Sequence, residues 1–470
     1  MPDEVRRAVR GRWRWPARPI AVEGVSTDTR TARAGDLFVA LRGDRFDGHA
    51  FLADAADAGC LTAVVAHDVP LDEGLLERFG GGVIGVPDTT AALGDLAARC
   101  RDHIAGSVVG VTGSNGKTTV KRMIDHILSR RLKGSGSPKS FNNAVGVPLT
   151  LFAVAPDDDY VICEIGTSAP GEIAALARIA RPDVAVIVSV AETHLAGLID
   201  LEHVAREKAA LLGGVPPAGV AVVPADSEPL DRARRAYDVN LIRFGASDAA
   251  DLRLTGYEPR PGGLRFELNG RRWVDLAVPG RHNALNALAA IAVAQRFGFD
   301  QDAAADALAD YRGEVMRLER IDADGLTVLN DAYNANPASL AAGVEAMASF
   351  AGRRRVVVAA DMLDLGPRSA DLHRAAGRAI ADVGADLVVG VGEMGRLIAE
   401  AADAAGAPAT EAIETVEAAR EIVPGLLKRG DVVLLKGSRA TGMERLVEPI
   451  RAARRKGRRT ARGKGKATGC

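Results

Sequence analysis

Residues 107–128, SVVGVTGSNGKTTVKRMIDHIL, pass from a β-branched strand through a glycine-rich turn into a helix. Glycines in such a turn let backbone N–H groups close around phosphate oxygens, and the following helix N-terminus adds partial positive charge. Lys117 can reach the β- and γ-phosphates of a nucleotide, and the Thr118 hydroxyl is placed to ligate Mg²⁺. The predicted nucleotide-binding loop comprises Thr112, Gly113, Ser114, Asn115, Gly116, Lys117, Thr118 and Thr119.

The loop departs from the usual P-loop pattern, G-x-x-x-x-G-K-[ST], at one position. Val111 stands six residues before Lys117, where that pattern has glycine, and the nearby glycines are Gly110 and Gly113. A glycine turn without a ligand is the structural alternative. The G-K-T-T sequence between a strand and a helix favours phosphate binding.

Strands and helices alternate on both sides of this loop. The strand-like segments 160–166 and 183–190 flank a helical segment, 171–180, and the alternation resumes beyond Arg317. This pattern is typical of parallel sheets covered on both faces. Residues 251–277 instead predict an antiparallel meander with a turn at 261–263. We predict an α/β protein with a small N-terminal α/β domain (1–106), a central P-loop parallel-sheet domain (107–315), a C-terminal Rossmann-like domain (316–456) and a basic, disordered tail (457–470).

Length and composition agree with this organisation. The 470 residues suit about three domains, and 60 Lys and Arg against 61 Asp and Glu give a net charge of -1. No global attraction to nucleic acid or to anionic membranes is therefore expected. Four widely spaced cysteines argue against a disulfide scaffold or a cysteine zinc site. With no signal-peptide core and no apolar run of membrane-spanning length, we expect a cytoplasmic protein.

The C-terminal segment 451–466 carries nine Lys or Arg and no acid. Contact with nucleic acid or a membrane is one interpretation of this charge. A solvated, disordered end is favoured, because such a segment buries little apolar surface.

Several further motifs follow the P-loop in order along the chain. They are FNNAVGVPLTL (141–151), EIGTSAPGEI (164–173), ETHL (192–195), EKAAL (207–211), GRHNALNALAA (280–290), RLERI (317–321), NDAYNANPASL (330–340) and KGSRATGMERLVE (436–448). This set resembles the Mur ligases and their folylpolyglutamate-synthetase relatives, which are ATP-dependent amide-forming enzymes. Segments 26–51, 330–337 and 361–366 are most similar to the branch that adds D-alanyl-D-alanine to UDP-MurNAc-tripeptide.

The resemblance implies a metal site with an unusual lysine. Glu164 is expected to ligate Mg²⁺ and His194 a second Mg²⁺, and Lys208 is expected to react with CO₂ and become a carbamate, which adds oxygen ligands. The ordinary alternatives are a solvated glutamate, a loop histidine and a surface lysine. Only a neutral amine reacts with CO₂, so the site must lower the pKa of Lys208. The implied catalytic residues are Lys117, His194 and Lys208, and the implied metal ligands are Thr118, Glu164, His194 and carbamylated Lys208.

The resemblance also implies contacts with the substrates. Asn283 and Asn286 would contact adenine, although helix capping is an alternative for Asn283. Arg317 would bind phosphate and Asp331 the ribose. The remaining expected contacts are Thr27 and Thr29 with uridine diphosphate, Asn142 and Asn143 with substrate or their own loop, Tyr333, Asn334 and Asn336 with D-alanyl-D-alanine, and Lys436, Ser438 and Arg439 with peptide or nucleotide.

The expected reaction follows from the poor electrophilicity of a carboxylate. ATP phosphorylates it to an acyl phosphate, which the free amine then attacks, so the enzyme must neutralise phosphate charge and exclude water. Because the implied ATP contacts come from two domains, the third domain should close over the second. We expect small-molecule substrates, no nucleic acid, no membrane insertion and a monomer. The alternatives are a MurE-type or polyglutamate-type ligase for another amine, and a non-catalytic P-loop module.

Overall fold

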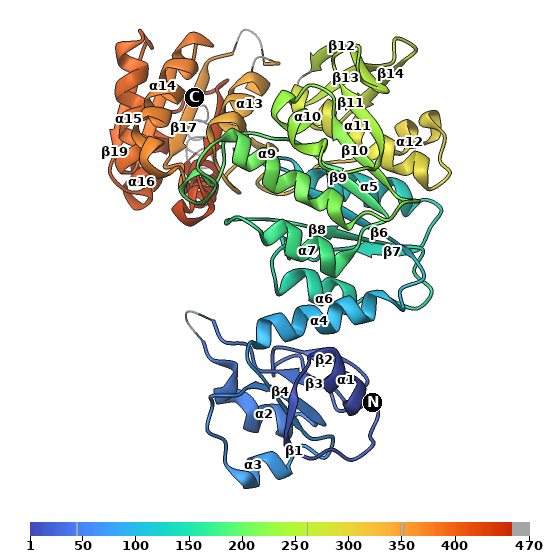
Figure 1. Ribbon diagram of the computed structural model, residues 1–470. Coiled ribbons are helices and arrows are strands. Elements are labelled where there is room, and N and C mark those ends of the chain that lie inside the picture. Colours follow the sequence, from blue (N-terminus) through green and yellow to red (C-terminus); the bar gives the residue numbers. More distant parts are fainter. Residues whose placement is uncertain (44–45, 261, 348, 351–352, 454–470) are drawn as a thin grey trace, which may run out of the picture.

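The computed structural model describes residues 1–43, 46–260, 262–347, 349–350 and 353–453. Three α/β units follow one another along the chain, and each is built on its own sheet (Figure 1). The sheets lie within residues 12–86, 107–276 and 319–436, while the exact domain boundaries given above remain predictions. The tail predicted at 457–470 lies outside the described residues. In the described part of the chain, no helix is long and apolar enough to span a membrane.

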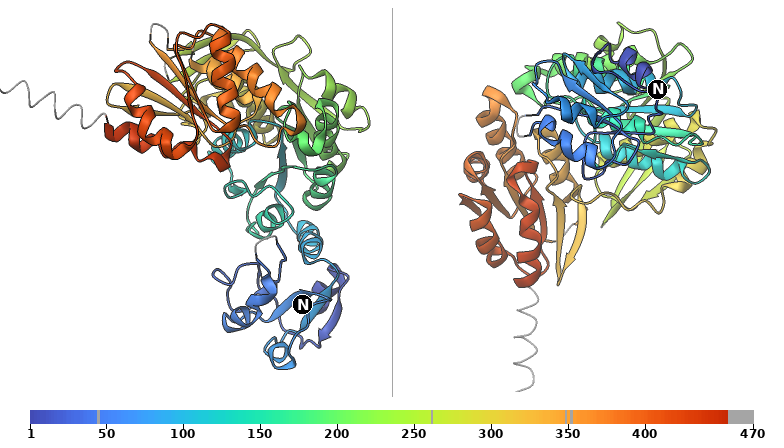
Figure 2. Two further views of the ribbon diagram at one scale, coloured as in Figure 1. Left: turned by 90° about the vertical axis from the view of Figure 1, so that its left-hand side faces the viewer. Right: turned by 90° about the horizontal axis from the view of Figure 1, so that it is seen from below.

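The first unit is a five-stranded sheet at the lower end of the molecule in Figure 1. Its strand order is β1 (Arg12–Trp15), β5 (Val83–Val86), β4 (Thr62–Ala66), β3 (Leu37–Val39) and β2 (Val25–Ser26), and only β1 is antiparallel. The helices are α1 (Pro2–Ala8), α2 (Leu52–Asp57), α3 (Glu73–Glu77) and α4 (Thr89–Arg101). Helix α4 lies between this unit and the next, where it contacts α6 and α7 (Figure 2).

The second unit is a nine-stranded sheet that carries the P-loop. Its order is β14 (Arg272–Leu276), β13 (Gly263–Leu268), β12 (Leu252–Arg260), β11 (Asn240–Gly245), β10 (Val220–Pro224), β9 (Val184–Ile187), β6 (Ser107–Thr112), β8 (Tyr160–Glu164) and β7 (Gly134–Gly136). Neighbouring strands are parallel from β12 through β11, β10, β9, β6 and β8 to β7. At the other end of the sheet, β13 pairs antiparallel with both β12 and β14. The meander predicted at 251–277 is confirmed for the described residues, which exclude Pro261.

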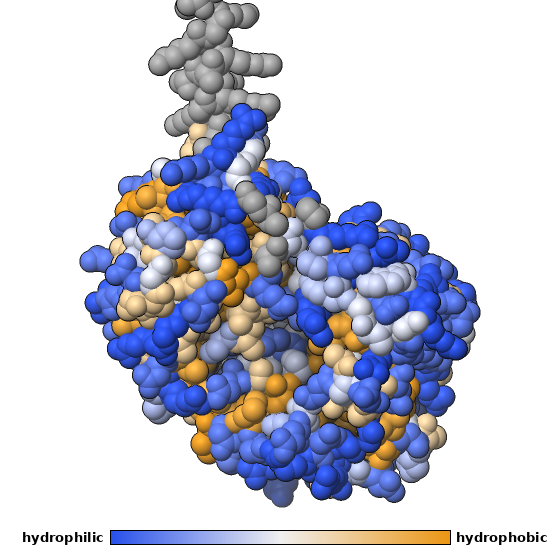
Figure 3. Space-filling model, turned by 90° about the horizontal axis from the view of Figure 1, so that it is seen from above, coloured by the Kyte–Doolittle hydropathy of each residue, from blue (hydrophilic) through white to orange (hydrophobic). Residues whose placement is uncertain are grey.

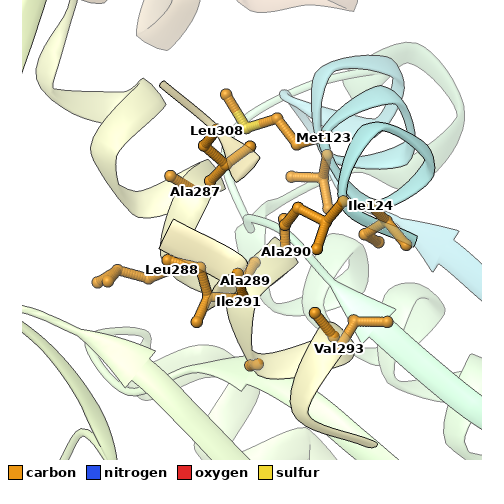
Figure 4. Packing of buried hydrophobic residues seen from close by; sticks show 14 of the residues in the cluster. Met123, Ile124, Ala287, Leu288, Ala289, Ala290, Ile291, Val293 and Leu308 are labelled. Atoms are coloured by element: carbon orange, nitrogen blue, oxygen red, sulfur yellow. The ribbon is translucent and has the colours of Figure 1, made fainter. Parts of the chain in front are cut away.

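Helices cover this sheet and position its loops. They are α5 (Lys117–Leu128), α6 (Gly146–Phe152), α7 (Glu172–Ala180), α8 (Leu195–Leu198), α9 (Leu201–Ala209), α10 (Glu228–Arg234), α11 (Arg281–Arg296) and α12 (Gln301–Ala307). Met123 and Ile124 of α5 belong to the same buried cluster as Leu288 and Ile291 of α11, and Figure 4 shows Ala290 of α11 lying toward Ile124. Burying each such side chain contributes about 1.5–3 kcal/mol, so this core holds the P-loop helix in place.

The third unit is a six-stranded sheet. Its order is β15 (Glu319–Ala323), β16 (Leu326–Asp331), β20 (Val432–Lys436), β17 (Arg355–Ala360), β18 (Leu387–Val391) and β19 (Thr410–Ile413), with only β15 antiparallel. Helices α13 (Pro337–Met347), α14 (Ser369–Asp382), α15 (Glu393–Ala404) and α16 (Val416–Leu426) complete it. Separate apolar clusters on the two faces of the sheet show that both faces are covered.

Candidate active site

A cavity of about 1160 Å³ begins where β6, β8 and β9 end and is lined by residues of all three units. Ligands of parallel α/β sheets bind at this carboxyl edge. Figure 3 shows the second and third units from above, with a mostly hydrophilic surface that is hollowed where the two meet. The cavity is therefore an inter-domain site, as the sequence analysis expected.

The P-loop forms one wall of the cavity. Gly116 has a φ of 82°, and a Cβ there would lie 2.7 Å from Oδ1 of Asn286, so glycine is required. The backbone N–H groups of Ser114 and Asn115 donate to Ser189 O and Oγ. The Lys117 Nζ donates to Gly113 O at 2.7 Å and thus folds back over its own loop.

Glu164 lies at the floor of the cavity and is 2% exposed. Its Oε2 accepts a hydrogen bond from the Thr118 hydroxyl at 2.9 Å and lies 3.1 Å from Lys121 Nζ. Its Oε1 accepts from Asn142 Nδ2 at 3.1 Å. Burial alone would raise the pKa of Glu164, but Lys121 and Lys117 outweigh burial and lower that pKa, which favours an ionised carboxylate.

Lys121 was not identified from the sequence. It is one helical turn beyond Lys117 on α5, and its ammonium donates to the carbonyl groups of Ser137 and Lys139 at 2.8 and 2.6 Å. Its spacing of four residues from the P-loop lysine was the signal that could have revealed it, because such residues share a helix face.

His194 also lines the cavity, immediately before α8, in a left-handed conformation. Its Nδ1 lies 3.8 Å from Oδ2 of Asp364, a residue of the third unit. Burial, together with the charges of Lys117 and Lys208, lowers the pKa of His194. The ring is therefore neutral at pH 7, which is the form that can ligate a metal.

Lys208 on α9 is 2% exposed, which excludes a solvated surface lysine. Burial and the charge of Lys117 lower the pKa of Lys208 to about 7. No hydrogen bond or ion pair joins its ammonium to another described residue. Lys208 does not itself line the cavity, but it lies within electrostatic reach of Lys117 and His194.

The third unit reaches the P-loop directly. The Arg317 guanidinium donates to the Thr118 hydroxyl at 2.9 Å and stacks 4.0 Å from the ring centre of Tyr333. The Asn336 amide exchanges hydrogen bonds with the Asn115 amide, at 2.7 and 3.3 Å. The Tyr333 hydroxyl bonds to the Ser140 hydroxyl. These contacts join residues of the second and third units that are more than 190 positions apart in the chain.

Asp331 and Lys436 form an ion pair at the carboxyl ends of the neighbouring strands β16 and β20. The Lys436 Nζ lies 2.7 Å from Asp331 Oδ2 and donates to Asn334 O, and all three residues line the cavity. Ser438 and Arg439, which were expected to contact peptide or nucleotide, do not line it. The Ser438 hydroxyl accepts from Leu363 N and Arg439 pairs with Glu444, so the structure does not bring these two to the cavity, and their contact with peptide or nucleotide stays a prediction.

Asn283 and Asn286 are buried at the start of α11 and line the cavity. The Asn283 Nδ2 donates to Pro279 O at 2.7 Å, and its Oδ1 accepts from Asn286 Nδ2 at 3.0 Å. The residue that precedes the helix is Gly280, so Asn283 is not its N-cap.

Asn142 and Asn143 also line the cavity, but with different bonds. Asn142 contacts Glu164, whereas the Asn143 Oδ1 accepts from the backbone of residues 145 and 146 and so shapes the start of α6.

The residues of the N-terminal unit that line the cavity differ from those expected from the sequence. Thr27 and Thr29 are half-buried and lie outside the lining, so the structure does not bring them to the cavity. Asp28 forms an ion pair with Arg30 and holds their own loop. The lining residues from this unit include Arg10, Asp88, Thr90 and Asp95, which no motif in the sequence marked.

The chain matches three family models that cover most of its length. They are the Mur ligase family, catalytic domain (residues 21–101), the Mur ligase middle domain (111–294) and the Mur ligase, glutamate ligase domain (316–439).

Curated relatives match along nearly the whole chain. The UDP-N-acetylmuramoyl-tripeptide--D-alanyl-D-alanine ligase of Bacillus subtilis (strain 168) is 35% identical and covers 91% of this chain and 93% of the relative. The same ligase of Escherichia coli (strain K12) is 36% identical, and the match covers 92% of this chain and 94% of the relative.

Solved structures show the same architecture. MurF from Acinetobacter baumannii has a TM-score of 0.86 at 30% identity, covering 96% of this chain and 98% of that chain. MurF ligase from Thermotoga maritima in complex with ADP has a TM-score of 0.82 at 26% identity, and the match covers 93% of this chain and 99% of that chain.

Proposed function

The chain belongs to the Mur ligase family, and from this premise we propose that it joins D-alanyl-D-alanine to UDP-N-acetylmuramoyl-tripeptide at the expense of ATP. The family, the three-domain α/β fold and the class of ATP-dependent ligase, all predicted from the sequence, are confirmed. The observation that carries the proposal is the bond between Arg317 and Thr118, because it brings the third domain onto the P-loop.

The proposed reaction has two steps. A carboxylate oxygen of the tripeptide attacks the γ-phosphorus of ATP, the bond to ADP breaks, and an acyl phosphate forms. The dipeptide amine then attacks the acyl carbon, inorganic phosphate leaves with the bonding electrons, and the nitrogen loses a proton. Lys117, Arg317 and the P-loop amides are positioned to neutralise the charge that develops on the transferred phosphoryl group.

The residues at the cavity floor fit Mg²⁺. The Thr118 hydroxyl and the Glu164 carboxylate are hard oxygen donors, and His194 lies on the same cavity. Among the described residues, no group of three or more His, Cys, Asp or Glu side chains is arranged to hold a metal ion. Mg²⁺ bound beside a nucleotide is commonly held by one or two protein ligands together with phosphate oxygens and water. When bound, Mg²⁺ neutralises phosphate charge and polarises the transferred group.

Lys208 is proposed to be carbamylated. Its neutral amine would attack the carbon of CO₂ and lose a proton, which gives a carboxylate-like group beside the metal site. Burial without an ion pair, and a pKa lowered to about 7, support this assignment. The nearby positive charge of Lys117 would stabilise such an anion.

The substrate contacts remain proposals. ATP would meet the P-loop, Asn283, Asn286, Arg317 and Asp331, and D-alanyl-D-alanine would meet Tyr333, Asn334 and Asn336, all of which line or adjoin the cavity. Asn142 and Asn143 are assigned to the acyl substrate, and Thr27 and Thr29 to its uridine diphosphate. A monomer in the cytoplasm stays a prediction.

An amine panel tests the proposed function. Phosphate release is measured with ATP, Mg²⁺ and UDP-N-acetylmuramoyl-tripeptide, with D-alanyl-D-alanine, a diamino acid or glutamate as acceptor. Release and a pentapeptide product are expected only with D-alanyl-D-alanine. Release with another amine would indicate a different ligase of the family, and ATP binding without any amide product would indicate a non-catalytic module.

A further inference from the structure

We propose that Lys121 is a positioning residue of the metal site. Its ammonium fixes the Glu164 carboxylate from behind the cavity wall, and it keeps a divalent cation from binding there firmly until a nucleotide is present. This role rests on the proposed function, because it requires that Glu164 ligate the cation that accompanies ATP.

The Lys121 ammonium bonds to three oxygen atoms. Its Nζ lies 3.1 Å from Glu164 Oε2 and donates to Ser137 O at 2.8 Å and to Lys139 O at 2.6 Å. An ammonium has three donors and no acceptor, so these oxygens use all of its donors. The side chain is 1% exposed, so a buried charge is both paired and fully hydrogen-bonded. The group is therefore charged and fixed in place.

Both oxygens of the Glu164 carboxylate are held. Oε1 accepts from Asn142, and Oε2 accepts from Thr118 and lies beside Lys121. Of these three side chains, only Lys121 is charged. Its two backbone acceptors, at 137 and 139, belong to the segment that leads to Asn142. Lys121 thus joins both the carboxylate and the segment that carries another of its donors to α5.

Lys121 differs from the other cations near Glu164 in where it lies. Lys117 and Arg317 line the cavity, where phosphate groups can bind them. Lys121 does not line the cavity, although Glu164 does, so it approaches the carboxylate from the protein side. Because its three donors are all taken by protein oxygens, it stays on Glu164 whether or not a nucleotide is bound.

This fixed charge sets the order in which metal and nucleotide bind. An ammonium 3.1 Å from the ligand oxygen offsets the charge of the carboxylate and repels a divalent cation. Without a nucleotide, Glu164 is thus a weak ligand. The phosphates of ATP supply further negative charge, and Mg²⁺ in nucleotide sites is usually held by one or two carboxylates plus substrate phosphates. The metal is therefore expected to enter with the nucleotide.

A purely structural clamp is the alternative role for Lys121. The same three bonds would then only secure the fold, and removal of the ammonium would loosen Glu164 and weaken metal binding. The two roles therefore predict opposite changes in the affinity for metal.

The test is titration of the nucleotide-free full chain with Mn²⁺, an oxygen-preferring substitute for Mg²⁺. Binding is followed by the loss of the electron paramagnetic resonance signal of the free ion. The wild type is expected to bind with a dissociation constant of roughly 1 mM. K121M, whose side chain has a similar length and no charge, is expected to bind about tenfold more tightly or better. The double variant E164Q/K121M should lose this gain, which would place the ion at Glu164.

R354M is the matched control, because it also removes the cation of a buried carboxylate. Arg354 lies 2.9 Å from Asp431, which is 1% exposed, and the two residues precede β17 and β20. They therefore lie at the amino ends of these strands, away from the cavity at the carboxyl ends. R354M should change the affinity for Mn²⁺ by less than about twofold.

Unchanged or weaker Mn²⁺ binding in K121M would overturn the role of Lys121, and so would a gain that persists in E164Q/K121M. A wild-type dissociation constant below about 10 μM without nucleotide would also overturn it, and this measurement does not depend on the folding of any variant. A chain that shows the expected Mn²⁺ affinities but releases phosphate only with another amine would refute the proposed function and leave the role of Lys121 standing.

Discussion

Lys208 combines two properties that rarely occur together in a structural lysine. It is almost completely buried, and its ammonium has no ion pair with any described residue. A buried charge without a partner is costly, so the neutral amine is favoured. Conversion to a carbamate would turn this unpaired group into a ligand.

We therefore predict that K208A loses about 100-fold or more in kcat, and that acetate or formate restores part of it. The small carboxylate would occupy the space of the carbamate and supply its oxygens. Phosphate release with increasing acetate is the measurement. K133A is the control, since Lys133 is exposed and paired with Asp157, and it should show neither loss nor rescue. Full activity in K208A would refute the carbamate.

A second single residue, His373, is expected to make the stability of the protein depend on pH. It is fully buried, its Nδ1 donates to Ser369 O at 2.6 Å, and its Nε2 accepts from Met362 N at 2.8 Å. Burial lowers the pKa of His373 below 6.5 in the folded state. The stability from this histidine is therefore fully present above the unfolded-state pKa and is lost as the pH falls below it.

We predict that the melting temperature of the wild type falls more between pH 7.5 and pH 5 than that of H373Q. The glutamine side chain does not titrate, so its variant lacks this contribution. Thermal unfolding followed by circular dichroism at both pH values gives the two differences. Equal falls in the two proteins would contradict the assignment.

At the scale of elements, the sequence predicted what depends on local pattern. The P-loop lies between β6 and α5, and Glu164 ends β8 at the ligand edge, because both follow from a strand that stops at a marked motif. Arg10 and Asp95 carry no such mark. Asp95 reaches the cavity because α4 packs against α7, a contact between helices some 80 residues apart, and Arg10 follows α1, which packs on α4. Ser438 follows β20 as expected, yet its hydroxyl turns to Leu363.

Helix α11 packs against α5, the helix that follows the P-loop. Leu288 of α11 is fully buried in the cluster that also contains Met123 and Ile124 of α5. We predict that L288A destabilises the central domain by about 2–5 kcal/mol, through lost burial and the cavity that remains. I422A on α16 is the control, because Ile422 is exposed and should change stability by less than about 0.5 kcal/mol. Urea unfolding with and without MgATP measures both, and a small effect of L288A would contradict this role of α11.

At the scale of the whole molecule, the active site exists only when two domains meet. Arg317, Tyr333 and Asn336 of the third domain bond to Thr118, Ser140 and Asn115 of the second. Side chains from one domain alone would leave the phosphate site open to water. The structure is therefore closed at this junction, and turnover requires that the junction open to exchange substrates and products.

An exposed ion pair, Arg368 with Glu192, lies at the same junction and offers a test that leaves the site itself intact. We predict that R368E and E192R each lower kcat/KM by roughly twofold to fivefold, the effect of about 0.5–1 kcal/mol expected for an exposed pair. The double variant R368E/E192R should recover most of the loss, because the pair is restored with its charges exchanged. High salt should lower the wild-type rate toward that of the single variants.

The matched control for this swap is the pair of Arg396 and Glu400, which lies within α15 and bridges no domains. R396E/E400R and its single variants should leave kcat/KM unchanged within about twofold. Losses in R368E and E192R that simply add in the double variant would show that the two residues do not act as a pair. In that case each residue would act on turnover separately, and domain closure would depend on the other contacts between the two domains, those at the P-loop and that of His194 with Asp364.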